Sequence, residues 1–117
     1  MYSIEALQKK VNHEIDAWSD ELSKKEPQQL YAPVKYALSM GGKRLRPVLL
    51  LMSSNIFLDD IENGLPAALA VEIFHNFTLL HDDIMDKAEM RRNNPTVHKH
   101  FSENTAILSG DAMAFLS

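Results

Sequence analysis

Three aspartates, Asp82, Asp83 and Asp86, lie at the end of an apolar stretch of the sequence. On a helix, side chains four residues apart share a face at about 6 Å, so Asp82 and Asp86 would repel each other unless a cation lay between them. Magnesium prefers oxygen ligands and usually combines one or two carboxylates with waters and substrate phosphates. The spacing is therefore typical of a magnesium ion that bridges protein and diphosphate, although a solvated acidic helix end would share this string.

Three cations follow two glycines in the segment 41–47, which reads Gly-Gly-Lys-Arg-Leu-Arg-Pro. Glycine lets the backbone approach a ligand closely, lysine offers phosphate a point charge, and arginine offers it a planar fork. A helix that starts at Pro47 would add the positive end of its dipole. The segment is a candidate anion-binding loop, and a solvated loop with surface bases is the alternative for the string alone.

Two adjacent arginines, Arg91 and Arg92, follow the carboxylates by a few residues, and each could hold a different phosphate. His75 precedes Asp82 by two helical turns and lies on roughly the same face of the expected helix. Taken alone, the arginines would be a surface charge pair and the histidine a packed core residue. Beside the carboxylates, all three become candidates for binding an anion.

The elements that must position these residues are helices. Apolar residues recur at steps of three or four, the period of an amphipathic helix, and Ser3 and Ser102 are candidate N-caps. The expected helices span residues 4–22, 30–38, 47–58, 66–86 and 102–117, with a helical turn over 96–101 and a polar loop over 91–95. The predicted fold class is all-α without strands, and the almost wholly apolar helix 47–58 is expected to be deeply buried.

Composition narrows the class of protein. A length of 117 residues makes a single domain the default, and a net charge of -4 argues against nucleic acid as the main partner. The absence of cysteine excludes disulfides and thiolate metal sites. No apolar run approaches the roughly 20 residues of a transmembrane segment, and no signal peptide is evident, so we expect a cytoplasmic protein.

Taken together, these strings resemble the trans-isoprenyl diphosphate synthases, the polyprenyl synthetase family of prenyltransferases. The resemblance covers about residues 30–117 and rests on five segments in the family's order. They are the segment 41–47, His75, Leu80–Asp86 (LHDDIMD), Arg91–His98 (RRNNPTVH) and Gly110-Asp111. Each string alone is common, but their joint occurrence in this order is specific.

The resemblance implies a head-to-tail condensation of isopentenyl diphosphate with an allylic diphosphate such as dimethylallyl, geranyl or farnesyl diphosphate. It implies that isopentenyl diphosphate is bound by Lys43, Arg46, His75 and Arg92. It implies that the allylic diphosphate is held by Arg91 and by Mg2+ on Asp82 and Asp86, which together stabilise the departing diphosphate. Arg44 would support the basic segment without touching the ligand, and the family usually forms homodimers.

In this family, residues just before the first aspartate cluster set the length of the product. Phe77 stands five residues before Asp82, and Thr78 stands four before it. A bulky Phe77 would close the pocket and favour a short product, such as farnesyl or geranylgeranyl diphosphate. Plain packing of Phe77 in the core is the alternative.

The family's second aspartate-rich motif does not occur in these 117 residues. We therefore expect residues 1–117 to be the N-terminal part of one all-α prenyltransferase domain, a helical bundle of the isoprenoid synthase type, and to be inactive alone. The alternatives are a non-catalytic helical fragment or subunit, a terpene cyclase-like enzyme, and an HD-type phosphohydrolase that would bind its metal through His81.

Overall fold

A computed structural model describes residues 2–117, and most of these residues are helical. The helices are α1 (Ile4–Ser23), α2 (Gln28–Ser39), α3 (Leu45–Phe57), α4 (Leu65–Met85), α5 (Val97–His100) and α6 (Glu103–Leu116). A 3-10 turn, η1 (Glu62–Gly64), leads into α4, and two short strands, β1 (Met90–Arg91) and β2 (Asn94–Pro95), lie between α4 and α5. The predicted all-α class and the predicted helices are confirmed.

The segment 91–95 is not the plain loop that we predicted. Its two strands pair antiparallel, with Met90 opposite Pro95 and Arg91 opposite Asn94. The two residues between the strands, Arg92 and Asn93, have φ angles of 49° and 65°, and positive φ at both central positions closes a tight hairpin whose twist matches its strands. Two-residue strands are too short for an alternating pattern to reveal them in the sequence.

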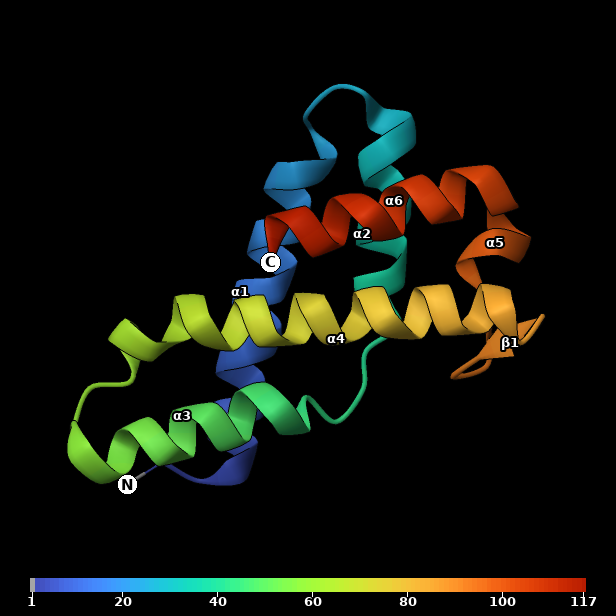
Figure 1. The fold of residues 1–117 in the computed structure, drawn as a ribbon. Coiled ribbons are helices and arrows are strands. Elements are labelled where there is room, and N and C mark those ends of the chain that lie inside the picture. Colours follow the sequence, from blue (N-terminus) through green and yellow to red (C-terminus); the bar gives the residue numbers. More distant parts are fainter. Residues whose placement is uncertain (1) are drawn as a thin grey trace.

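The helices form two crossing layers (Figure 1). Helix α4 lies between α3 and α6 in one layer and packs against both, while α1 and α2 cross behind them. The hairpin and α5 lie beside the C-terminal end of α4. Because α4 contacts every other α-helix, it is the element on which a site can be assembled.

Helix ends follow the predicted signals. The Ser3 side chain accepts a hydrogen bond from the Ala6 amide, and the Ser102 side chain accepts one from the Thr105 amide, both at 3.1 Å. These two N-caps satisfy amides that have no partner within their helices. The core is formed by buried apolar residues from all the longer helices, among them Leu7, Val11, Ile15, Val34, Leu38, Val48, Leu51, Ile73, Leu80, Ala106 and Met113.

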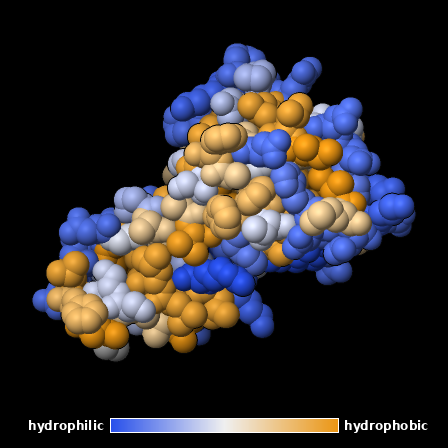
Figure 2. Space-filling view, viewed as in Figure 1, coloured by the Kyte–Doolittle hydropathy of each residue, from blue (hydrophilic) through white to orange (hydrophobic). Residues whose placement is uncertain are grey.

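Helix α3 is not deeply buried, so that prediction is wrong. Only Pro47, Val48 and Leu51 are buried, whereas Ile56 and Phe57 are 72% and 85% exposed. The helix packs on its neighbours along one side, and no element of residues 2–117 covers the other side. Figure 2 shows the resulting apolar surface over α3 and along α4. No helix in the described part of the chain is long and apolar enough to cross a membrane.

Candidate active site

Four of the predicted site residues come together in one pocket. It has a volume of about 490 Å³ and lies between α4 and residues 41–46, which we call the basic loop and which include the first two residues of α3. We call it the basic pocket; its lining residues are Gly42, Lys43, Arg44, Leu45, Arg46, Glu72, His75 and Arg92. The loop, the middle of α4 and the hairpin are distant in sequence, and the fold brings their cations to one place.

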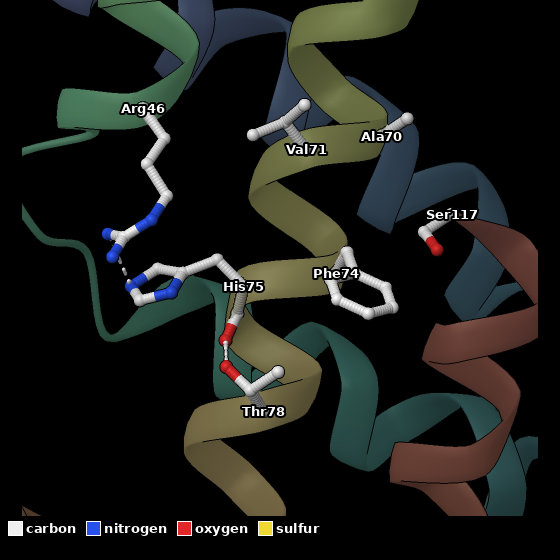
Figure 3. Close-up of a pocket in the computed structure, with 7 residues that line it drawn as sticks. All are labelled: Arg46, Ala70, Val71, Phe74, His75, Thr78 and Ser117. Carbon is white, nitrogen blue, oxygen red and sulfur yellow. Dashed lines mark hydrogen bonds between the residues drawn. The ribbon is translucent and has the colours of Figure 1, made fainter.

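His75 and Arg46 lie in contact at the wall of the basic pocket, and Figure 3 shows the same pair from a neighbouring pocket that both also line. The distance between Arg46 Nη1 and His75 Nε2 is 3.2 Å, and since a guanidinium can only donate, the imidazole nitrogen accepts. Burial, and then the positive charge of Arg46, lower the pKa of His75. A lowered pKa favours the neutral ring that can accept this hydrogen bond.

Arg92 approaches the basic loop from the hairpin. Its Nη1 donates a hydrogen bond of 2.7 Å to the carbonyl oxygen of Gly41. Gly42 has a φ of +133°, and a Cβ atom there would lie 3.0 Å from both Cζ and Nη2 of Arg92. The second glycine therefore provides the space in which the guanidinium lies against the loop. Burial, and then the charge of Arg91, lower the pKa of Arg92.

Arg44 points away from solvent and holds the loop from behind. It is 4% exposed, and its guanidinium donates to Asn12 Oδ1 at 2.9 Å, Glu72 Oε2 at 3.0 Å and the Leu38 carbonyl at 2.8 Å. These contacts confirm the prediction that Arg44 supports the loop. Glu72 was missed by the sequence reasoning, although an acid within an otherwise apolar helix signals a buried partner.

The three aspartates lie at the C-terminal end of α4 as predicted, but they differ in exposure and in their partners. Asp82 and Asp86 are exposed, and no ion pair joins either of them to another residue within 2–117. Asp83 is 7% exposed, and its two oxygens accept from Nε and Nη2 of Arg91 at 2.7 and 2.8 Å. The described residues contain no group of three or more His, Asp or Glu side chains arranged to hold a metal.

The hairpin connects the carboxylates with the basic pocket. Arg91 reaches Asp83, and the next residue, Arg92, reaches Gly41. Tyr36 of α2 anchors the hairpin by donating from its hydroxyl to the Pro95 carbonyl at 2.7 Å, and the buried Thr96 donates to the Ala88 carbonyl at 2.9 Å. The adjacent arginines therefore reach two separate clusters.

A second, more apolar pocket adjoins the basic pocket and shares Arg46 and His75 with it. It has a volume of about 480 Å³, and Figure 3 shows the seven residues that line it: Arg46, Ala70, Val71, Phe74, His75, Thr78 and Ser117. Thr78 lines it and donates from its hydroxyl to the His75 carbonyl at 2.6 Å. We call it the apolar pocket.

Phe77 does not line the apolar pocket. It packs against the core and makes edge-to-face contacts with the rings of Phe74 and His81, at centroid distances of 5.2 and 4.9 Å. Phe74 takes the lining position instead and is 50% exposed. The sequence reasoning missed Phe74, although its place one helical turn before Phe77 was the available signal.

Comparison with known proteins identifies the family. The polyprenyl synthetase family model matches residues 27–117. A geranylgeranyl pyrophosphate synthase of Geoglobus acetivorans is 48% identical over 105 residues, which are 90% of this chain and 32% of that protein. A geranylgeranyl diphosphate synthase of Methanosarcina mazei is 42% identical over 114 residues, covering 97% of this chain and 35% of that protein.

Among solved structures, a crystal structure of a geranylgeranyl pyrophosphate synthase superimposes with a TM-score of 0.91 and 47% sequence identity. The match covers 99% of this chain and 35% of that chain. The present chain thus spans about a third of the length of the curated relatives it matches. With the family model covering most of the sequence, the chain belongs to the polyprenyl synthetase family.

Proposed function

We propose that this chain supplies the substrate-binding part of a prenyltransferase that condenses isopentenyl diphosphate with an allylic diphosphate. The observation that carries the proposal is the pair of adjacent arginines, of which Arg91 reaches the carboxylate end of α4 and Arg92 reaches the basic pocket. One hairpin thereby joins two clusters that are each suited to a diphosphate. A reaction between two diphosphates requires such neighbouring sites.

In this proposal the basic pocket holds isopentenyl diphosphate. Lys43 supplies a point charge, Arg46 and Arg92 supply planar forks, and His75 supplies a ring nitrogen at the pocket wall. A diphosphate would replace the Gly41 carbonyl as the acceptor for Arg92, and it would bind more strongly because charge-assisted hydrogen bonds exceed neutral ones. The volume of about 490 Å³ leaves room for the ligand.

In the same proposal, Asp82 and Asp86 hold Mg2+ against the allylic diphosphate. Exposed carboxylates four residues apart on a helix suit a hard cation that takes one or two carboxylates and fills its shell with phosphate oxygens and water. Bound magnesium would neutralise charge on the departing diphosphate. Arg91 would add a cation beside it, while Asp83 orients the guanidinium.

In this proposal the reaction has three steps. The carbon–oxygen bond of the allylic diphosphate breaks and leaves an allylic cation, with the bonding electrons on the diphosphate. The double bond of isopentenyl diphosphate attacks the cation to form the new carbon–carbon bond, and the resulting cation loses an adjacent proton to the released diphosphate, which restores a double bond. Arg91 and the cations of the basic pocket would stabilise charge on both diphosphates throughout.

The apolar pocket would receive the prenyl chain. Along α4 its wall runs from Thr78 past His75 and Phe74 to Val71. A product of farnesyl or geranylgeranyl length would fit a pocket that Phe74 narrows, with Thr78 on its wall and Phe77 packed behind. We keep Phe77 and Thr78 as predicted determinants of chain length, with Phe77 acting through Phe74.

A binding experiment on the chain itself tests the two clusters. Isothermal titration calorimetry should show that it binds inorganic diphosphate, and Lys43→Ala or Arg46→Ala should weaken binding by about tenfold, because each removes a charge-assisted contact. Lys24→Ala is the control, since Lys24 is 73% exposed and lies at the end of α1. Equal affinity for the wild type and the Lys43 and Arg46 variants would refute the proposed role of the basic pocket.

Magnesium dependence tests the carboxylates separately. Mg2+ should increase the affinity for diphosphate, and Asp82→Asn or Asp86→Asn should remove that increase, whereas Asp59→Asn in the turn before α4 should not. An increase that survives loss of both carboxylates would exclude them as the magnesium ligands. His81→Ala should keep the increase; its loss would favour a metal on His81, as in a phosphohydrolase.

We propose further that turnover requires a longer protein, because the relatives are about three times as long and no second aspartate-rich motif occurs in these 117 residues. The chain incubated with labelled isopentenyl diphosphate, an allylic diphosphate and Mg2+ should release no elongated product; any product would contradict this. A cytoplasmic homodimer also stays a prediction for the whole protein, to be tested by fractionation and by light scattering.

A further inference from the structure

Helix α1 touches the basic loop through two polar side chains. Gln8 Nε2 donates to the Lys43 carbonyl oxygen at 2.9 Å, and Asn12 Oδ1 accepts from Arg44 Nε at 2.9 Å. Gln8 and Asn12 are four residues apart and therefore share a face of α1. The family model begins at residue 27, so neither side chain belongs to the part of the sequence that identifies the family.

The basic loop needs support because its backbone is unusual. Gly41, Gly42 and Arg44 have φ angles of 77°, 133° and 53°. Arg44 is also the residue before α3, and it makes no side-chain cap for that helix. A side-chain-bearing residue in the left-handed region is strained and persists only where its surroundings hold it.

The two contacts from α1 act on adjoining parts of the loop, the Lys43 carbonyl and the Arg44 side chain. The Lys43 carbonyl, which Gln8 binds, belongs to the peptide bond that joins Lys43 to Arg44. Asn12 holds the Arg44 side chain in the buried cluster with Glu72 and the Leu38 carbonyl. The Lys43–Arg44 peptide is thus held by Gln8 at its carbonyl oxygen and by Asn12 through the Arg44 side chain.

We propose that Gln8 and Asn12 are positioning residues for the diphosphate in the basic pocket. They hold the Lys43–Arg44 peptide so that the side chains of Lys43 and Arg46 lie with His75 around one cavity. Neither Gln8 nor Asn12 lines that cavity, so each acts through the loop. The inference rests on the proposed function of the basic pocket.

Two shape-conserving substitutions test the inference. Gln8→Met removes the donor to the Lys43 carbonyl, and Asn12→Leu removes the acceptor for Arg44. Each should weaken the binding of inorganic diphosphate without divalent cations by about 3- to 10-fold, the effect of one lost hydrogen bond. Asn12→Asp keeps the oxygen that faces Arg44 Nε and should restore binding close to that of the wild type.

A core variant of the same helix separates positioning from general stability. Val11 is 1% exposed and lies among the apolar core residues, so Val11→Ala should lower the melting temperature through lost packing. Its affinity for diphosphate should stay that of the wild type. If Val11→Ala weakens binding as much as Gln8→Met and Asn12→Leu do, the effect is one of stability and the inference is wrong.

The outcomes distinguish this inference from the proposed function. If Lys43→Ala binds diphosphate weakly while Gln8→Met and Asn12→Leu bind like the wild type, the proposed function of the basic pocket is supported. The positioning role of Gln8 and Asn12 is then refuted. If the wild type does not bind diphosphate, or if Lys43→Ala and Arg46→Ala bind like the wild type, both the function of the basic pocket and the positioning role are refuted. Weak binding by Gln8→Met and Asn12→Leu, with recovery in Asn12→Asp, supports both.

Discussion

Arg91 donates hydrogen bonds to both carboxylate oxygens of Asp83, at 2.7 and 2.8 Å. Hydrogen bonding of the Arg91 guanidinium to the Asp83 carboxylate is the main cause of the raised pKa of Arg91. The pair divides the three aspartates at the end of α4 into one that holds the hairpin and two that remain exposed. A carboxylate cluster that looks uniform in the sequence thus has two structural roles.

The first prediction separates these roles by stability. Asp83→Asn should lower the free energy of unfolding by about 1–3 kcal/mol, because it weakens a largely buried bidentate ion pair. Asp82→Asn should change it by less than about 0.5 kcal/mol, because an exposed carboxylate is replaced. Urea unfolding of the two variants measures the difference. Equal losses would mean that the Arg91–Asp83 pair does not hold the hairpin.

The second prediction concerns the two glycines of the basic loop. Gly42→Ala should lose about 1–3 kcal/mol of stability from backbone strain at a φ of +133°. It should also weaken diphosphate binding, since the new Cβ would lie 3.0 Å from Arg92 Cζ. Gly41→Ala is the matched control, because its φ is +77° and no atom lies within 4 Å of a Cβ there.

Gly41→Ala should therefore lose stability through backbone strain, with little change in its affinity for diphosphate. Calorimetric titration of both variants gives the comparison. If the two variants lose affinity equally, the position of Arg92 against Gly42 has no part in binding.

The third prediction concerns the contact of α6 with α4. A Cβ on Gly110 would overlap the His81 ring, with Cδ2 at 2.6 Å, and would lie 3.2 Å from Leu80 Cδ2. Gly110→Ala should thus cost about 1–3 kcal/mol by overpacking. In the double variant with His81→Ala, the two costs should be less than additive. Thermal unfolding of the single and double variants completes the cycle, and strict additivity would contradict the proposed clash.

The fourth prediction concerns pH. The pKa of His75 is lowered, first by burial and then by Arg46, and a bound diphosphate would raise it again by its negative charge. As the pH falls below the usual histidine value of 6.5, the wild type should gain diphosphate affinity relative to His75→Gln, by up to about tenfold. The ligand's own titration is common to both proteins and cancels in the comparison.

Without ligand, lowering the pH has the opposite effect, because it favours the unfolded wild type. The unfolded chain takes up the proton first as the pH falls below 6.5, since the folded pKa lies lower. The wild type should then lose stability relative to His75→Gln. Above that pH, the difference in stability between the two proteins should not change with pH. Unfolding curves at several pH values test this, and a wild type that becomes relatively more stable in acid would contradict it.

Local patterns in the sequence were sufficient for the helices and for naming candidate site residues. The period of Leu7, Val11 and Ile15 predicts α1, and the caps Ser3 and Ser102 mark two helix starts, because these signals depend on neighbours within one or two turns. The cations of the basic loop, His75 and Arg92 could be assigned to one pocket only by resemblance to a family. Their separation in the chain leaves their distances undetermined by local rules.

Tertiary structure alone decided which of those residues meet and which bonds they make. It paired Asp83 with Arg91, moved the lining position from Phe77 to Phe74, and left the outer face of α3 exposed. It also brought Gln8 and Asn12 of α1 to the basic loop. Such contacts depend on how helices cross and on which side chain fills a given space, and the sequence period specifies only which face of a helix is apolar.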